Sequence, residues 1–115
     1  MPVFRLQSNA LLDAQQRASL RKDLSASIAS WLGKSESYVL VHLELDLDMI
    51  FGGTDDPCAY CELASLGLDS SAHPSLAASV TSLVSERLSV APDRIYIRFE
   101  APARTDFAWD GKPFA

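Results

Sequence analysis

The residue with the clearest chemical potential in this chain is Pro2, which follows Met1 and precedes the strand-like run 3–6. Removal of Met1, which the small proline side chain permits, would expose a secondary amine held in a ring at the edge of that strand. An α-amino group titrates near pH ~8, and burial in an apolar pocket disfavours its ammonium form, so its pKa falls toward the range of a general base. The simpler interpretation is that Pro2 is only a convenient second residue, because a motif of one residue is weak evidence.

The other candidates for chemistry are a Cys-x-x-Cys pair, Cys58 and Cys61, and the two histidines, His42 and His73. Such a cysteine pair suggests redox or metal chemistry. Here it begins a predicted strand, where three residues span ~10 Å and reverse the side-chain face, whereas a disulfide needs Cα atoms within ~7 Å. We therefore expect two packed thiols. The histidines have no standard zinc-site spacing, so we expect no metal, and His42 on a sheet is more often structural than catalytic.

Composition sets the class of protein. The chain has 115 residues, of which 48% are hydrophobic, and a formal net charge of -5, which predicts one globular domain over residues 1–115 whose core needs no metal or disulfide. The chain has an excess of acidic residues and no cluster of basic residues, which argues against nucleic-acid binding. No apolar run approaches the ~20 residues of a membrane span, and the N-terminus does not read as a secretory signal. We expect a cytoplasmic protein, with non-classical secretion to the extracellular space as the alternative.

Hydrophobic periodicity predicts two helices and four strands. Apolar residues recur every three or four positions in residues 13–32 and 71–88, as on one face of a helix. Asp13 and Gln16 resemble a capping box at the start of the first helix, and Gly33 suits its end. Alternation with period two predicts strands at residues 3–7, 38–47, 58–66 and 94–100. The tail, residues 101–115, is rich in aromatic residues where a free terminus is usually polar.

An internal repeat orders these elements. When the sequence is aligned with itself so that Pro2 matches Cys58, predicted strands align with strands and the first helix aligns with the second. The repeats therefore cover roughly residues 1–50 and 57–106. Right-handed crossovers then predict an α+β fold, in which two strand–helix–strand repeats form a mixed four-stranded sheet with both helices on one face. The opposite face stays uncovered unless other copies of the chain cover it. It carries His42, Glu44, Tyr96 and Arg98.

Nine short segments, in order and with nearly unaltered spacing, give the whole chain a specific resemblance. They are Met1-Pro2, Gly33-Lys34, Val41-His42, Phe51-Gly52-Gly53, Pro57-Cys58-Ala59-Tyr60-Cys61, Ser65-Leu66-Gly67, Glu86-Arg87-Leu88, Pro92-Asp93-Arg94-Ile95-Tyr96-Ile97 and the ending from Trp109 to Phe114-Ala115. Together they resemble the macrophage migration inhibitory factor (MIF) family of the tautomerase superfamily. The resemblance implies a homotrimer with active sites between subunits and cofactor-independent keto–enol tautomerisation of phenylpyruvate-type acids or dopachrome.

The resemblance also implies a role for individual residues. Pro2 would be the catalytic base, Lys34 and the backbone N–H of Leu66 would hold the oxygens of the substrate, and Tyr96 would enter from the neighbouring subunit. Trp109 and Phe114 would form walls of the pocket. Two further positions depart from the animal proteins. Arg98 stands in place of asparagine, where it either adds a cation for a carboxylate or crowds the pocket. Phe107 stands in place of valine and adds bulk at the rim.

Three classes of function are consistent with these observations. The leading one is an isomerase of the phenylpyruvate tautomerase or dopachrome isomerase type, acting on a small aromatic keto acid without a cofactor. The second is a cytokine-like or protein-binding signal with a protein receptor and a weak or vestigial pocket; the resemblance implies it because vertebrate members of the family also act as extracellular cytokines. The third is a thiol oxidoreductase that uses Cys58 and Cys61, which the strand geometry disfavours.

Overall fold

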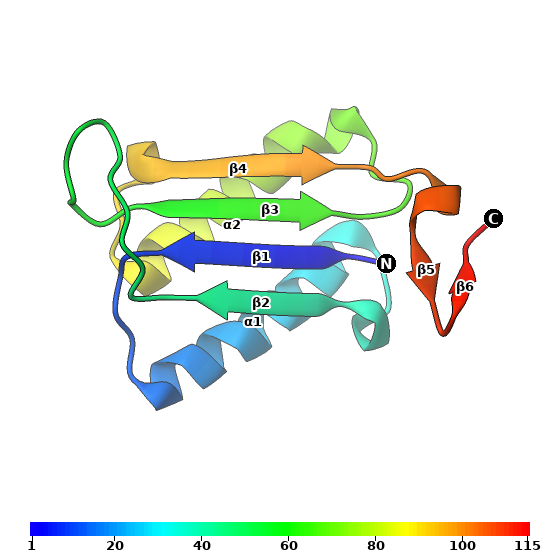
Figure 1. Cartoon of the computed structure of the whole chain (residues 1–115), viewed down its shortest axis with the longest axis horizontal. Coiled ribbons are helices and arrows are strands. Elements are labelled where there is room, and N and C mark those ends of the chain that lie inside the picture. The colour runs from blue at the N-terminus through cyan, green and yellow to red at the C-terminus, as the bar shows by residue number, and fades with distance from the viewer.

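The computed structural model describes residues 1–115 as a four-stranded mixed sheet with two helices behind it (Figure 1). The main elements are β1 (Val3–Ser8), α1 (Ala14–Leu32), β2 (Leu40–Glu44), β3 (Ala59–Ala64), α2 (His73–Leu88) and β4 (Ile95–Glu100), followed by a hairpin of β5 (Ala108–Trp109) and β6 (Lys112–Pro113). The strand order is β2-β1-β3-β4; the outer pairs are parallel and the central pair is antiparallel. This arrangement confirms the predicted α+β fold of two strand–helix–strand units.

Both helices bury the apolar stripes that their periodicity predicts. In α1 the Asp13 carboxylate accepts a hydrogen bond from the Gln16 N–H (2.7 Å), and the Gln16 side chain accepts one from the Asp13 N–H, which completes the capping box. Pro74 lies in the first turn of α2, where its missing N–H costs nothing. The core between helices and sheet includes Phe4, Leu6, Leu20, Leu24, Ile28, Leu63, Leu76, Val80, Val84 and Leu88. Neither helix has the length and apolarity of a membrane span.

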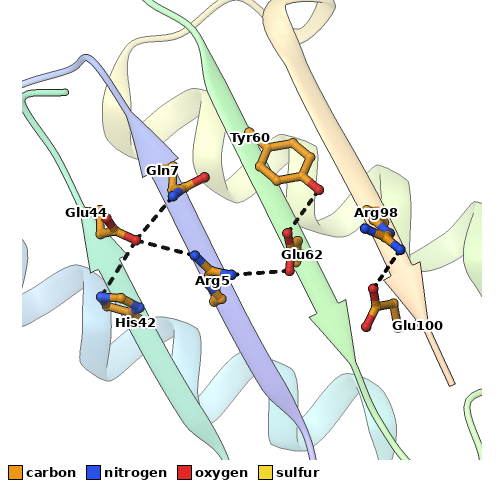
Figure 2. A network of polar contacts seen from close by, with 8 residues as sticks. All are labelled: Arg5, Gln7, His42, Glu44, Tyr60, Glu62, Arg98 and Glu100. Atoms are coloured by element: carbon orange, nitrogen blue, oxygen red, sulfur yellow. Dashed lines mark hydrogen bonds and ion pairs between the residues drawn. The ribbon is translucent and has the colours of Figure 1, made fainter. Parts of the chain in front are cut away.

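The face of the sheet away from the helices carries a network of charged and polar side chains (Figure 2). Arg5 lies between two carboxylates, 3.6 Å from Glu44 and 3.6 Å from Glu62. Contacts along the same face extend the network: Gln7 donates to Glu44, the Tyr60 hydroxyl donates to Glu62, His42 lies 3.8 Å from Glu44, and Arg98 lies 3.0 Å from Glu100. Every strand of the sheet contributes to this face, and no element of the same chain covers it (Figure 1).

Two of the predicted strands are too long at both ends. The strand expected at residues 38–47 covers only Leu40–Glu44, because Glu36–Tyr38 form a 3₁₀ turn capped by the Ser35 side chain and Asp46 adopts a left-handed backbone with φ 57°. The strand expected at residues 58–66 begins at Ala59 and ends at Ala64. Cys58 therefore precedes the strand, and its N–H donates to the Asn9 side chain instead of to a neighbouring strand.

Candidate active site

A pocket of about 390 Å³ opens at the N-terminal end of β1. Its volume lies in the range of small-molecule sites. Eight of its ten lining residues are hydrophobic, and they come from three separate stretches of chain: residues 1–3, residues 37–40 and residues 107–109. Three larger hollows lie on or beside α2, and at most half of the residues that line each of them are hydrophobic. The pocket at the N-terminus is therefore the apolar site in this chain that suits an aromatic ligand.

Pro2 forms the floor of this pocket and is fully buried. Its carbonyl accepts a hydrogen bond from the Leu40 N–H (3.0 Å), which ties it to the start of β2. In the chain described here Met1 acylates the Pro2 nitrogen, which is therefore an amide without basicity. The Met1 amino group lies in the same pocket, one residue before Pro2, and therefore indicates the environment of a free Pro2 amine. Burial, and secondarily the charge of Lys34, lower the pKa of this amino group below its ordinary value.

Lys34 reaches this region from the C-terminal end of α1. Gly33 ends the helix with a left-handed backbone (φ 63°), and its N–H donates to the carbonyls of Ala29 and Ser30. The Lys34 N–H donates to the Ala29 carbonyl (2.9 Å), so the chain turns sharply at this point. The helix end thus directs one cation toward the amine at the start of β1, and this cation disfavours the protonated amine.

Tyr38 also lines the pocket, which the sequence analysis missed. The alternation that begins at this residue predicts a strand, but Tyr38 is the last residue of a 3₁₀ turn. Its ring instead meets Trp109 edge to face, with ring centroids 5.8 Å apart. The signal in the sequence was the pair Ser35 and Ser37, because serine at this spacing often caps a turn.

The aromatic tail of the chain supplies the remaining walls of the pocket. Phe107 and Trp109 line it directly, and Trp109 is 57% exposed although it is a large apolar side chain. Phe114 returns along the β5–β6 hairpin, and its ring packs 6.0 Å from that of Phe107, while its N–H donates to the Phe107 carbonyl (3.1 Å). The hairpin therefore holds Phe107, Trp109 and Phe114 together beside the N-terminus (Figure 1).

Leu66 lies in the turn after β3, at the same end of the sheet as Pro2. The register places Val3 opposite Ala64, so the turn after Ala64 follows directly beside the start of β1. The Leu66 side chain is buried, and the backbone hydrogen bonds of the turn are made by the neighbouring N–H groups of Ser65 and Leu68. The N–H of Leu66 is thus left to bind another acceptor, which suits a role in holding an oxygen of a ligand.

The structure does not bring Tyr96 to the pocket of its own chain. Tyr96 pairs with Tyr60, and Tyr60 pairs with Gln7, so Tyr96 lies roughly 15 Å along the sheet from the start of β1. It is 65% exposed at the opposite end of the molecule. Arg98 lies between the two ends on the uncovered face, where Glu100 pairs with it (Figure 2). A site that uses both Pro2 and Tyr96 therefore needs two chains.

The cysteine pair forms no second site. Cys58 and Cys61 are both buried, and neither forms a disulfide. Burial in the core raises the pKa of the Cys61 thiol to about 12, so at neutral pH almost none of it is the reactive thiolate. No group of three or more histidine, cysteine or acidic side chains comes together as metal ligands. Packed thiols, as the sequence predicts, are what the structure contains.

A mixed four-stranded sheet built from two strand–helix–strand units, with both helices on one face, is the fold of the tautomerase superfamily. The chain belongs to the MIF family, since the model of the family "Macrophage migration inhibitory factor (MIF)" matches residues 1–115. It is 33% identical to macrophage migration inhibitory factor from Mus musculus over the whole of both chains, and 35% identical to a homolog from Brugia malayi over 99% of each. The crystal structure of the homologue from Prochlorococcus marinus superimposes with a TM-score of 0.91 at 32% identity, covering 98% of this chain and 99% of that one.

Proposed function

We propose that this protein is a keto–enol tautomerase of phenylpyruvate-type 2-keto acids, with dopachrome as a second candidate substrate, and that Pro2 is its general base once Met1 has been removed. The observation that carries the proposal is the full burial of Pro2 in an apolar pocket where burial and Lys34 lower the pKa of the adjacent Met1 amine. The Met1 amine that shows this lowered pKa itself lines the pocket beside Pro2. The proposed reaction needs no cofactor.

The mechanism follows from the charges that the reaction develops. The carbon next to the keto group of the substrate is a weak acid, so its proton must pass to a base that is neutral near pH 7. The lone pair of the Pro2 amine accepts that proton, and negative charge then develops on the carbonyl oxygen. The Lys34 ammonium and the free N–H of Leu66 can stabilise this oxygen. Return of the same proton from Pro2 to the other end of the enolate completes the isomerisation, and the aromatic walls hold the ring of the substrate.

We further propose that the working unit is a homotrimer in which the uncovered sheet faces are buried and Tyr96 of each chain completes the pocket of a neighbour. Two features support this arrangement. The face opposite the helices has no cover in one chain, and Tyr96 is highly exposed far from the pocket of its own chain. Closed cyclic assemblies bury such a repeated face in each subunit by the same contact.

The direct test is a tautomerase assay on purified protein whose N-terminus has been checked by intact mass. Enol–keto conversion of phenylpyruvate above the buffer rate is expected, and dopachrome is assayed in parallel. Absence of turnover in protein that begins at Pro2 and has the native fold would contradict the proposal. It would favour the alternative in which the pocket serves recognition of a protein receptor.

The assembly makes its own prediction. Light scattering at micromolar concentration is expected to give a mass three times the 12.5 kDa of one chain, because no element of the same chain covers the charged sheet face and Tyr96 is 65% exposed. A monomer mass under these conditions would eliminate any site that is shared between subunits.

Arg98 is expected to affect carboxylate substrates selectively. Arg98→Asn should raise the KM of phenylpyruvate by about threefold to tenfold, as loss of one charge-assisted contact predicts, and should leave the KM of its methyl ester nearly unchanged. Glu100 competes for the same guanidinium at 3.0 Å, which keeps the effect modest. Equal changes for acid and ester would show that Arg98 does not bind the carboxylate.

The buried thiols are expected to be dispensable for turnover. Cys61→Ser should keep the wild-type rate, whereas its unfolding free energy should fall by about 1–3 kcal/mol because a hydroxyl replaces the thiol in the core without a partner. Urea unfolding measures the stability, and phenylpyruvate turnover measures the activity. Loss of turnover in folded Cys58→Ser or Cys61→Ser protein would restore the thiol hypothesis.

A further inference from the structure

Arg94, the residue before β4, is bound to the backbone of the loop before β3 by four hydrogen bonds. Its Nε donates to the Pro57 carbonyl (3.0 Å), Nη1 donates to the Phe51 carbonyl (3.0 Å), and Nη2 donates to the carbonyls of Thr54 (3.3 Å) and Asp56 (2.9 Å). One guanidinium thus joins four carbonyl groups within residues 51–57. Only arginine offers several donors in a planar fork, so no other side chain can replace it.

The same loop contains a tight turn that Arg94 braces from one side. Phe51 and Thr54 exchange backbone hydrogen bonds of 2.9 and 3.2 Å across Gly52 and Gly53. Both glycines have positive φ, 61° and 81°, as a two-residue turn of this type requires. The loop is otherwise exposed and is joined to the body of the protein by few contacts apart from those of Arg94 and Asn9.

Phe51 connects this loop to Tyr96. The Arg94 guanidinium carbon lies 5.1 Å from the centre of the Phe51 ring, within cation–π range. The other neighbour of that ring is Tyr96, with centroids 4.8 Å apart. The Tyr96 hydroxyl makes no hydrogen bond within the chain, so the aromatic contact with Phe51 is the interaction that orients the Tyr96 ring.

We propose that Arg94 is a positioning residue for the active site of the neighbouring subunit. It holds the 51–57 loop, the loop holds Phe51, and Phe51 orients the ring of Tyr96 that enters the next pocket. This inference rests on the proposed function, in which Pro2 and Tyr96 of different chains share one site. It adds a residue that touches no substrate and acts on a pocket outside its own chain.

The kinetic test compares Arg94→Met, which keeps the aliphatic bulk without donors, with Arg94→Lys and with Arg87→Met. Arg87 is the matched control, because it also binds side chains distant in sequence, those of Asp23 and Ser19, but lies between the helices. Loss of a substrate-binding ring should raise the KM of phenylpyruvate by about tenfold in Arg94→Met with kcat changed less than about twofold. Arg94→Lys should be intermediate, and Arg87→Met should keep the wild-type KM. In a Tyr96→Ala background, Arg94→Met should add no further effect.

A mixing experiment separates action on the neighbour from action within the chain. Arg94→Met chains have an intact Pro2, and chains with an alanine inserted before Pro2 have an intact Arg94. After unfolding and refolding of equal amounts together, roughly a quarter of the sites of random trimers should combine intact Pro2 with intact Arg94 and recover the wild-type KM. If Arg94 acts on the pocket of its own chain, no site recovers the wild-type KM, because neither kind of chain has both an intact Pro2 and an intact Arg94. Failure to recover them overturns the proposal.

Hydrogen exchange gives a readout that does not depend on turnover. The amides of Phe51 and Thr54 should exchange faster in Arg94→Met than in wild type or Arg87→Met, and the nuclear Overhauser contact between the Phe51 and Tyr96 rings should be lost. Unchanged exchange and an unchanged ring contact would overturn the positioning role even if the KM rose. A third outcome is that wild-type protein is inactive while Arg94→Met still shows faster exchange and loses the ring contact. That result would overturn the proposed function and would limit the role of Arg94 to holding the loop.

Discussion

Protein that retains Met1 is expected to turn over phenylpyruvate about 10²–10⁴ times more slowly than protein that begins at Pro2, the usual cost of removing a general base. Retention makes the Pro2 nitrogen an amide, whose lone pair is not basic. Met1 does bring its own amine, and burial and Lys34 lower the pKa of that amine as well. That amine is displaced by one residue, however, and a misplacement of ~1 Å already costs up to ~10²-fold.

Three forms of the protein make this expectation specific. Pro2→Gly keeps an amine at the correct position but loses the ring, so it should retain part of the rate. An alanine inserted between Met1 and Pro2 acylates the proline permanently and should reduce turnover to near background. Intact mass identifies each N-terminus, and light scattering checks the assembly. Equal rates for Met1-retained and processed protein with the same assembly would show that Pro2 is not the base.

Lys34→Met is expected to lower kcat about 10²–10³-fold, because removal of one group that stabilises a developing oxyanion typically costs that much. It should also change the pH profile. The neutral amine is the active form, so activity rises as pH passes upward through its pKa. Lys34 lowers that pKa; without its charge the pKa rises, and the acidic limb of the profile moves to higher pH.

Lys22→Met is the matched control, since Lys22 lies on the exposed face of the same helix, α1. Its rate and its pH profile should equal those of wild type. If kcat of Lys34→Met falls while the acidic limb stays in place, Lys34 stabilises the oxyanion but does not lower the pKa of the Pro2 amine. If Lys34→Met has the wild-type kcat and an unchanged acidic limb, both proposed roles of Lys34 are wrong.

The fold could be predicted from the sequence because its signals are local and repeated. Leu20, Leu24 and Ile28 show the helix period directly, and Asp13 with Gln16 marks the start of the helix. The strand boundaries were less accurate because alternation continues past the point where pairing stops. Leu45 and Leu47 keep the period of two, yet the left-handed backbone of Asp46 ends β2 before them.

The site was harder to predict than the fold, since its parts come together only in three dimensions. The positions of Pro2, Lys34, Phe107 and Trp109 at one end of the sheet depend on a helix end, a strand start and a terminal hairpin. Tyr38 was missed because a single aromatic residue at a strand boundary carries no chemical signal of its own. The pairing of Arg98 with Glu100 likewise depends on both side chains facing the same side of β4.

The two buried cysteines have a consequence for where such a protein can work. A fold with a structural disulfide weakens in a reducing compartment, and one with an accessible thiolate is modified in an oxidising one. Cys58 and Cys61 avoid both problems, because they are unpaired, buried and, for Cys61, held in the thiol form by a pKa of about 12. The core therefore has no redox requirement, and the stability of the fold should be the same in reducing and in non-reducing buffer.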